Sequence, residues 1–286
     1  MIEIRNLKKK YGRFVAIEDF TLGLTEGKIY GILGKVNSGG TTIFNILCNY
    51  IFKDDGIVLI DGKDPEDARD LIYMCPKMEF YSKYPLGKVL NMVATFNSEF
   101  DLEYAVELCE NFKIDLTKKY KVDENISTCK IFNTIVTICM NKKYILFNKP
   151  EIGLSSLDMR KLSDILYGNY KRKGYTPIIH SKTVNYFFDY VDDIIIIKDK
   201  RVVLFESKDK LKKMVYSISG SSELIGTSIK DKNVIAIRTL RNFSKLKTAY
   251  ILAENEEELN QYSNRTVSLK ELYEAITISD GGSDYE

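Results

Sequence analysis

A glycine-rich loop near the N-terminus has the composition of a phosphate-binding loop. In a P-loop, backbone N–H groups at a helix N-terminus surround the β-phosphate, a lysine reaches the β- and γ-phosphates, and a Ser or Thr hydroxyl binds Mg²⁺. Here Gly34 and Gly39 occupy the places of the outer glycines, Thr41 and Thr42 follow, and Gly40 stands where the lysine belongs. Taken alone, this window is a weak match, little more specific than a glycine-rich turn.

Other residues that could carry chemistry are few. The chain of 286 residues has one histidine, His180, and five cysteines, none of them in a Cys-x-x-Cys pair. This composition excludes a histidine-rich metal site, and cysteines beside aliphatic residues indicate buried, reduced thiols. His180 lies in an apolar run, so we expect a buried, hydrogen-bonded core histidine rather than a catalytic one.

The overall composition is that of an ordinary globular protein. Hydrophobic residues make up 44% of the chain, and 42 Lys and Arg nearly balance 40 Asp and Glu. A net charge of +2 leaves no basic footprint for nucleic acid. No apolar run approaches the ~18 residues of a membrane span, and the N-terminus lacks the apolar core of a signal peptide. We therefore expect a cytosolic protein, unless another molecule holds it at a membrane.

Strand and helix patterns alternate around the loop. Short apolar runs predict strands buried on both faces, and apolar residues at helical spacing follow the loop. Strands alternating with helices predict an α/β fold with a mostly parallel sheet. Beyond about residue 207 the pattern changes, which predicts a small α+β appendage over 208–286. The predicted strands cover 29–33, 144–147, 176–179, 194–197, 233–237 and 248–252, and the predicted helices cover 41–48, 158–170 and 268–276, with helical patterns within 88–113.

The order of further motifs resembles that of the ATP-binding subunits of ABC transporters, over roughly residues 1–205. The resemblance implies a P-loop NTPase fold of the ABC ATPase type over 1–207, with a helical subdomain over about 80–140 and a C-terminal accessory region over 208–286. Residues 265–273 are similar, more weakly, to the tail of subunits that serve two-component exporters. The similar segments are Leu7–Gly12, the loop window 34–42, Phe52–Gly62, Ile72–Lys77 at the Q-loop, Ile126–Lys130 at the signature, Tyr144–Pro150 at the Walker B strand, Gly153–Ser155 at the D-loop, and Ile178–Lys182 at the switch.

Nearly every residue that carries chemistry in that family is changed. Asn148 is a neutral amide that cannot balance a divalent cation, and Lys149 cannot accept a proton while it is charged. Because phosphoryl transfer depends on positioning and electrostatics, we predict little or no ATP hydrolysis by this chain alone. Gly40 replaces the P-loop lysine, Lys77 the Q-loop glutamine, Asn148 the Mg²⁺-linked aspartate, Lys149 the catalytic glutamate and Lys182 the switch histidine, while Ser127 agrees with the signature.

The resemblance also implies a nucleotide site, with Tyr11 stacked on the adenine. Two interpretations of Lys77, Lys149 and Lys182 stay open: they replace Mg²⁺ and the loop lysine as counter-charge, or they are solvated around a decayed site. Either one implies at most weak ATP binding and disfavours Mg²⁺ as a cofactor. The residues that would hold nucleotide are Tyr11, Gly34, Asn37, Ser38, Gly39, Gly40, Thr41 and Thr42.

The resemblance implies partners as well. Without a membrane span of its own, a family member docks beneath a separate permease, as a peripheral protein on the inner face of the cell membrane. In the family, two subunits pair each P-loop with the partner's signature, so a homodimer of this chain would hold no competent site. A heterodimer with an intact subunit is therefore favoured. The alternatives are a free regulatory pseudo-ATPase, or ligand-sensing module, and a working ATPase with a rearranged site.

Overall fold

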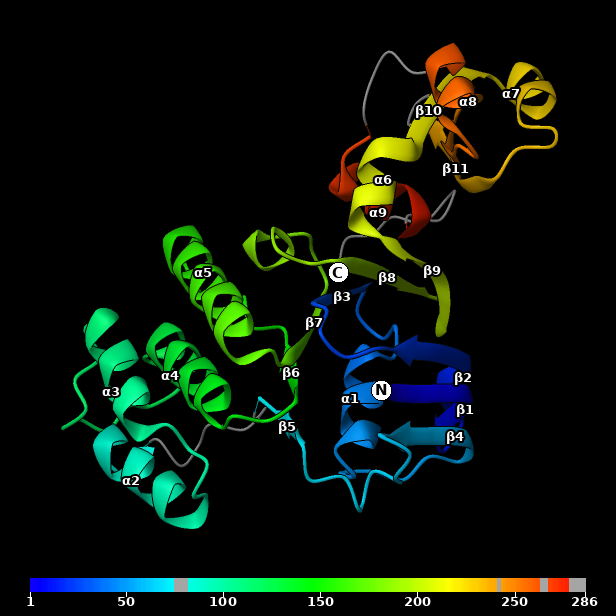
Figure 1. Ribbon diagram of the computed structural model, residues 1–286. Coiled ribbons are helices and arrows are strands. Elements are labelled where there is room, and N and C mark those ends of the chain that lie inside the picture. The colour runs from blue at the N-terminus through cyan, green and yellow to red at the C-terminus, as the bar shows by residue number, and fades with distance from the viewer. Residues whose placement is uncertain (75–81, 241–242, 263–266, 278–286) are drawn as a thin grey trace.

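The computed structural model describes residues 1–74, 82–240, 243–262 and 267–277 (Figure 1). At its centre the described residues form a six-stranded sheet in the order β5-β6-β7-β3-β8-β9. All neighbouring strands are parallel except β8 and β9, which pair antiparallel. The strands are β5 (Leu71–Tyr73), β6 (Tyr144–Asn148), β7 (Thr176–Ser181), β3 (Tyr30–Gly34), β8 (Asp193–Lys198) and β9 (Arg201–Ser207).

The central strands form because their sequences are apolar on both faces. Every residue of β3 and β7 is buried, as the continuous apolar runs predict. In the register, Ile32 of β3 and Asn148 of β6 both pair with His180 of β7. Because parallel strands end at the same edge, this register brings the end of β6 and the last residues of β7 beside the loop that follows β3.

A second, antiparallel sheet packs near the central one in the order β2-β1-β4. Its apolar side chains and those of helix α1 form a core with the face of the central sheet that carries Tyr30, Ile32 and Leu146. This core holds α1 between the two sheets, as Figure 1 shows. The elements are β1 (Ile2–Tyr11), β2 (Phe14–Leu24), β4 (Asp55–Ile60) and α1 (Gly40–Leu47).

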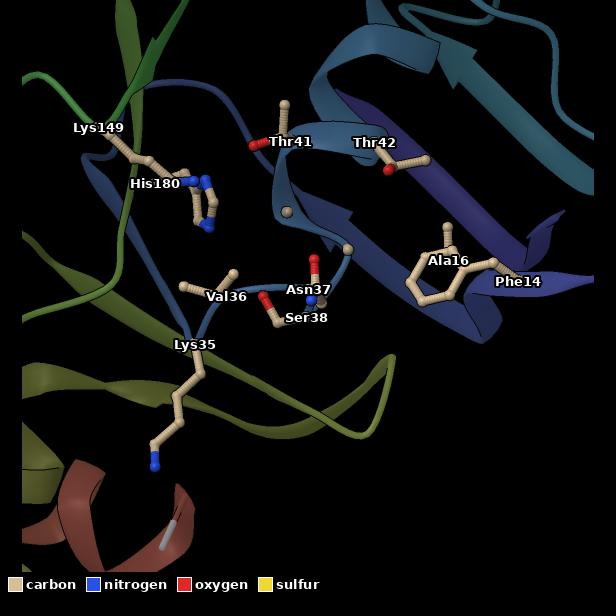
Figure 2. A pocket seen from close by; sticks show the side chains of 12 residues that line it. Phe14, Ala16, Lys35, Val36, Asn37, Ser38, Thr41, Thr42, Lys149 and His180 are labelled. Carbon is tan, nitrogen blue, oxygen red and sulfur yellow. The ribbon is translucent and has the colours of Figure 1, made fainter. Parts of the chain in front are cut away.

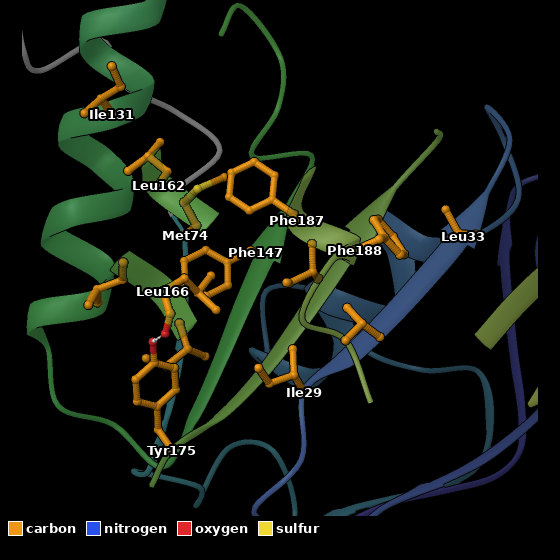
Figure 3. Packing of buried hydrophobic residues seen from close by; sticks show 14 of the residues in the cluster. Ile29, Leu33, Met74, Ile131, Phe147, Leu162, Leu166, Tyr175, Phe187 and Phe188 are labelled. Carbon is orange, nitrogen blue, oxygen red and sulfur yellow. Dashed lines mark hydrogen bonds between the residues drawn. The ribbon is translucent and has the colours of Figure 1, made fainter. Parts of the chain in front are cut away.

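Helices cover the opposite face of the central sheet. Phe147 of β6 packs there with Leu162 and Leu166, and with Phe187 and Phe188 (Figure 3). Burying such large apolar side chains contributes about 1.5–3 kcal/mol each. The elements on this side are α2 (Leu86–Phe96), α3 (Leu102–Asn111), α4 (Ile126–Cys139), α5 (Ser156–Lys173) and the short 3₁₀ helix η2 (Tyr186–Phe188).

The C-terminal residues form an antiparallel sheet with helices around it, in the order β10-β12-β11. Helix α9 joins this region to the rest of the molecule, because Leu272 and Tyr273 belong to the same apolar cluster as Phe188. The Tyr273 hydroxyl also donates to the backbone carbonyl of Lys182, 3.1 Å away. The elements are α6 (Lys208–Met214), β10 (Val215–Ser221), α7 (Ser222–Ser228), β11 (Val234–Leu240), β12 (Phe243–Leu252), α8 (Glu256–Tyr262) and α9 (Leu269–Thr277).

Candidate functional site

The glycine-rich loop makes a tight turn between β3 and α1. Asn37 and Gly39 have positive φ values of 65° and 104°, in the left-handed region. A Cβ on Gly39 would lie 2.8 Å from the carbonyl oxygen of Ala16, so residue 39 must be glycine for two reasons. Gly39 provides no side-chain cap for α1, which begins at Gly40. The first-turn N–H groups of a helix have no intrahelical acceptor, so this turn can hold an anion.

A pocket of about 160 Å³ opens in front of this turn (Figure 2). Its floor is the loop and the start of α1, and Lys149 and His180 reach it from the ends of β6 and β7. The pocket is lined by Phe14, Ala16, Lys35, Val36, Asn37, Ser38, Gly39, Gly40, Thr41, Thr42, Lys149 and His180.

The Asn148 side chain ties the end of β6 to its neighbours. Its Oδ1 accepts from Nδ1 of His180 at 2.8 Å, and its Nδ2 donates to the Tyr73 hydroxyl at 2.8 Å and to Oγ1 of Thr41 at 3.3 Å. The amide is therefore used as donor and acceptor by three different elements. Tyr73 could not have been found from the sequence, because it lies on β5 and meets Asn148 only through strand order.

The His180 side chain lines the pocket and packs against the loop at Gly40. Its side chain is 2% exposed, and a Cβ on Gly40 would lie 2.3 Å from its Nε2 atom. The sequence expectation of a buried, hydrogen-bonded histidine is confirmed, but the contact with the loop was not expected. Burial first, and the Lys149 charge second, lower the pKa of His180 to about 3. The ring is therefore neutral at physiological pH.

Lys149 and Glu151 place one charge of each sign beside the strand ends. The Lys149 backbone N–H donates to the His180 carbonyl at 2.7 Å, and its side chain extends toward the histidine ring in Figure 2. Glu151 accepts a hydrogen bond from Oγ of Ser181 at 2.6 Å, and burial raises its pKa. No sequence signal marks Glu151, because it lies two residues after Lys149, the position of the family's catalytic glutamate.

Several residues expected at the site lie elsewhere. Tyr11 does not line the pocket; it pairs with Phe14 in the β1–β2 hairpin, and Phe14 lines the pocket instead. Lys182 is exposed and outside the lining, because β7 ends at Ser181 and the chain leaves the strand there. Ser127 lies in the first turn of α4, away from this pocket. Lys77 lies outside the described residues.

The described part of the chain holds no group of three or more His, Cys, Asp or Glu arranged to bind a metal ion. Among the same residues, no helix is both long enough and apolar enough to cross a membrane.

The fold and the loop define a class of protein. A mostly parallel sheet with a P-loop-like turn, an antiparallel sheet beside it and a helical region opposite are the architecture of the ABC ATPase cassette. Two solved cassettes share it at a TM-score of 0.64 and 17% identity, and at 0.61 and 19%. The first, an ATP-binding subunit of an ABC transporter, covers 74% of this chain and 92% of its own. The second, a dimer in a post-hydrolysis state bound to ADP and Pi, covers 72% and 98%.

Curated sequence relatives are of the same kind as these solved structures. The chain is 25% identical over 239 residues to the ABC transporter ATP-binding protein YtrB of Bacillus subtilis, covering 82% of each chain. It is 20% identical over 211 residues to the lantibiotic transport ATP-binding protein SrtF of Streptococcus pyogenes, covering 73% of this chain and 92% of that one. No protein-family model matches the chain. Its homologues and structural neighbours are ABC transporter ATP-binding subunits, and the predicted resemblance and fold class are confirmed.

Proposed function

We propose that this chain is an ABC transporter ATP-binding subunit that binds nucleotide weakly and hydrolyses little or none of it. The observation that supports the proposal best is the residue type of Asn148 and its hydrogen bonds. In the family this position carries the Mg²⁺-linked carboxylate. Here a neutral amide occupies it, and its oxygen and nitrogen already bond to His180, Tyr73 and Thr41. A metal ion would find no negative charge at this position, and one lone pair of the amide oxygen already accepts from His180.

The charge beside Asn148 has also changed sign. Lys149 stands where the family has the glutamate that polarises the attacking water, and it lines the pocket. A protonated amine cannot act as a general base, although it attracts phosphate. Glu151 is not placed to replace the missing base, since it lies outside the pocket lining and its Oε1 accepts a hydrogen bond from Ser181. We therefore propose an anion site without the groups that cleave the anion.

Two measurements test this function together. We expect phosphate release from ATP to stay at the level of a protein-free blank, with or without Mg²⁺. Isothermal titration with ADP should give weak binding that is the same in Mg²⁺ and in EDTA. Hydrolysis above the blank that disappears in EDTA would contradict the proposed loss of catalysis. A complete absence of heat with ADP in both buffers would contradict nucleotide binding.

A pair of lysine variants tests the counter-charge. Lys149→Ala should weaken ADP binding about fivefold, because a partly buried ammonium contributes about 1 kcal/mol to an ion pair with phosphate. Lys119→Ala is the matched control, since Lys119 is exposed and lies outside the pocket lining. Equal ADP affinities for the two variants would favour the decayed, solvated interpretation of Lys149.

The partners follow from the family. We propose that the chain docks beneath a separate permease at the inner face of the membrane, and that it pairs with a second ATP-binding subunit. The relatives support this, because they are transporter subunits and one related cassette was solved as a dimer. Affinity purification from membranes should recover a permease and an intact ATP-binding subunit. Recovery of neither would favour a free regulatory pseudo-ATPase.

A further inference from the structure

The histidine ring fills the space that a lysine at residue 40 would need. A Cβ on Gly40 would approach Nε2, Cδ2 and Cε1 of His180 to 2.3, 2.6 and 2.6 Å. Such distances are far below van der Waals contact, so residue 40 can be only glycine while His180 holds its place. The absence of a side chain at residue 40 and the position of the His180 ring are therefore sterically coupled.

The hydrogen bonds of Asn148 determine which ring nitrogen carries the proton. Oδ1 of Asn148 lies 2.8 Å from Nδ1 of His180, and because an amide oxygen can only accept, Nδ1 donates to it. In the neutral ring, Nε2 then carries a lone pair. This atom is buried beside the loop and has no hydrogen-bond partner among the described residues.

The groups that surround the His180 ring favour its neutral form. Lys149, at the end of β6, is the charge that acts on it, and Phe44 of α1 packs edge-on with ring centroids 6.0 Å apart. Next to the histidine on β7, Ser181 donates a hydrogen bond to the carboxylate of Glu151. Tyr73 of β5 reaches the ring only through Asn148. From the loop side, Lys35 extends away from the ring in Figure 2.

An anion in the pocket would reverse this balance, because negative charge beside Nε2 favours a protonated ring. We propose that His180 is the phosphate ligand that replaces the P-loop lysine: when a phosphate group enters, Nε2 takes up one proton from solvent and donates a hydrogen bond to a phosphate oxygen. The inference rests on the proposed nucleotide binding. One N–H bond forms and none breaks in the protein, and Nδ1 keeps its proton for Asn148. The ligand class is a nucleoside di- or triphosphate, or a free polyphosphate.

The single histidine makes this step directly observable. In protein prepared without a histidine tag, every histidine ring signal in a ¹⁵N NMR spectrum belongs to His180. Without ligand, at pH 7, we expect one protonated nitrogen, Nδ1, and one with a lone pair, Nε2. Addition of ADP should convert Nε2 to the protonated form. Tripolyphosphate should do the same if the phosphate chain alone is recognised, whereas a response to ADP only would place the nucleoside in the recognition too.

A titration against His180→Gln gives the matching thermodynamic test. Glutamine keeps a polar side chain of similar length but cannot take up a proton. Between pH 8 and pH 6, wild-type affinity for ADP should rise up to about a hundredfold more than that of His180→Gln, because one extra proton taken up with each ligand changes the affinity tenfold per pH unit. Because the ADP phosphates titrate in the same way with both proteins, the comparison also cancels their contribution to the pH dependence.

The outcomes separate this inference from the function beneath it. ADP binding with Nε2 still unprotonated, and with the same pH dependence in both proteins, would overturn the role of His180 and leave nucleotide binding in place. No binding of ADP or tripolyphosphate to the wild type at either pH would overturn both. The NMR measurement needs only wild-type protein, so it decides the question even if His180→Gln does not fold.

Discussion

The two walls of the pocket are built by different means. The loop wall, residues 34–42, is made mostly of backbone, held in shape by left-handed conformations at Asn37 and Gly39. The strand wall is made of side chains, those of Asn148, Lys149 and His180 at the ends of β6 and β7. The loop wall keeps the shape that holds a phosphate. The strand wall presents an amide, a lysine and an imidazole to the same loop.

Under the proposed function, holding an anion and cleaving it depend on separate parts of the sequence. A backbone nest needs glycine at a few positions and tolerates other side chains around it. Catalysis by positioned charges fails when one carboxylate becomes an amide, because the electrostatic contribution belongs to that group. The two walls meet where Gly40 faces His180 and where Asn148 donates a hydrogen bond to Thr41.

The largest effect should come from restoring the lysine on the loop wall. Gly40→Lys forces new atoms against the His180 ring, and overpacking of this kind costs about 1–3 kcal/mol. We expect a free energy of unfolding lower by about 3 kcal/mol in urea denaturation, and no gain in ADP affinity.

The matched control removes the ring. His180→Ala in the Gly40→Lys background should recover most of the lost stability, and a double-mutant cycle should show coupling between the two positions. If Gly40→Lys alone were as stable as the wild type and bound ADP more tightly, the two walls would not be sterically coupled.

The sequence predicted the loop wall better than the strand wall. The strands β3, β6, β7 and β8 were found because runs buried on both faces carry a continuous apolar signal. The turn was found because glycines mark positions that other residues adopt poorly. These signals are local, so a single sequence carries them.

The strand wall depends on contacts between distant segments. The meeting of Gly40 with His180 follows from the pairing of β3 with β7, which spacing along the chain does not give. The resemblance placed Lys182 at the switch position, but β7 ends one residue earlier and leaves that side chain exposed. Likewise, the hairpin register that sets Tyr11 opposite Phe14 decides which ring lines the pocket.

A smaller effect should appear in the pH dependence of stability without ligand. Burial holds the native pKa of His180 near 3, while its unfolded value is about 6.5. As pH falls below 6.5 the unfolded chain gains a proton that the native chain does not, so stability decreases by up to about 1.4 kcal/mol per pH unit. Between pH 6.5 and 5 the wild type should lose about 2 kcal/mol more than His180→Gln in urea titrations. Equal losses would mean that the ring is not buried as a neutral group.

The smallest effect concerns the contact between the C-terminal region and the strand wall. The Tyr273 hydroxyl donates to the carbonyl of Lys182, two residues beyond His180. Tyr273→Phe should lower the free energy of unfolding by about 1 kcal/mol, the net contribution of one hydrogen bond. Tyr170→Phe is a matched control, since its hydroxyl donates to the Gly27 carbonyl at 2.9 Å, away from the pocket lining. ADP affinity should stay within about twofold of wild type in both variants, because the loop wall makes neither bond. A larger change of ADP affinity in Tyr273→Phe alone would show that the C-terminal region influences the strand wall. The position of that wall would then depend on more than the sheet register.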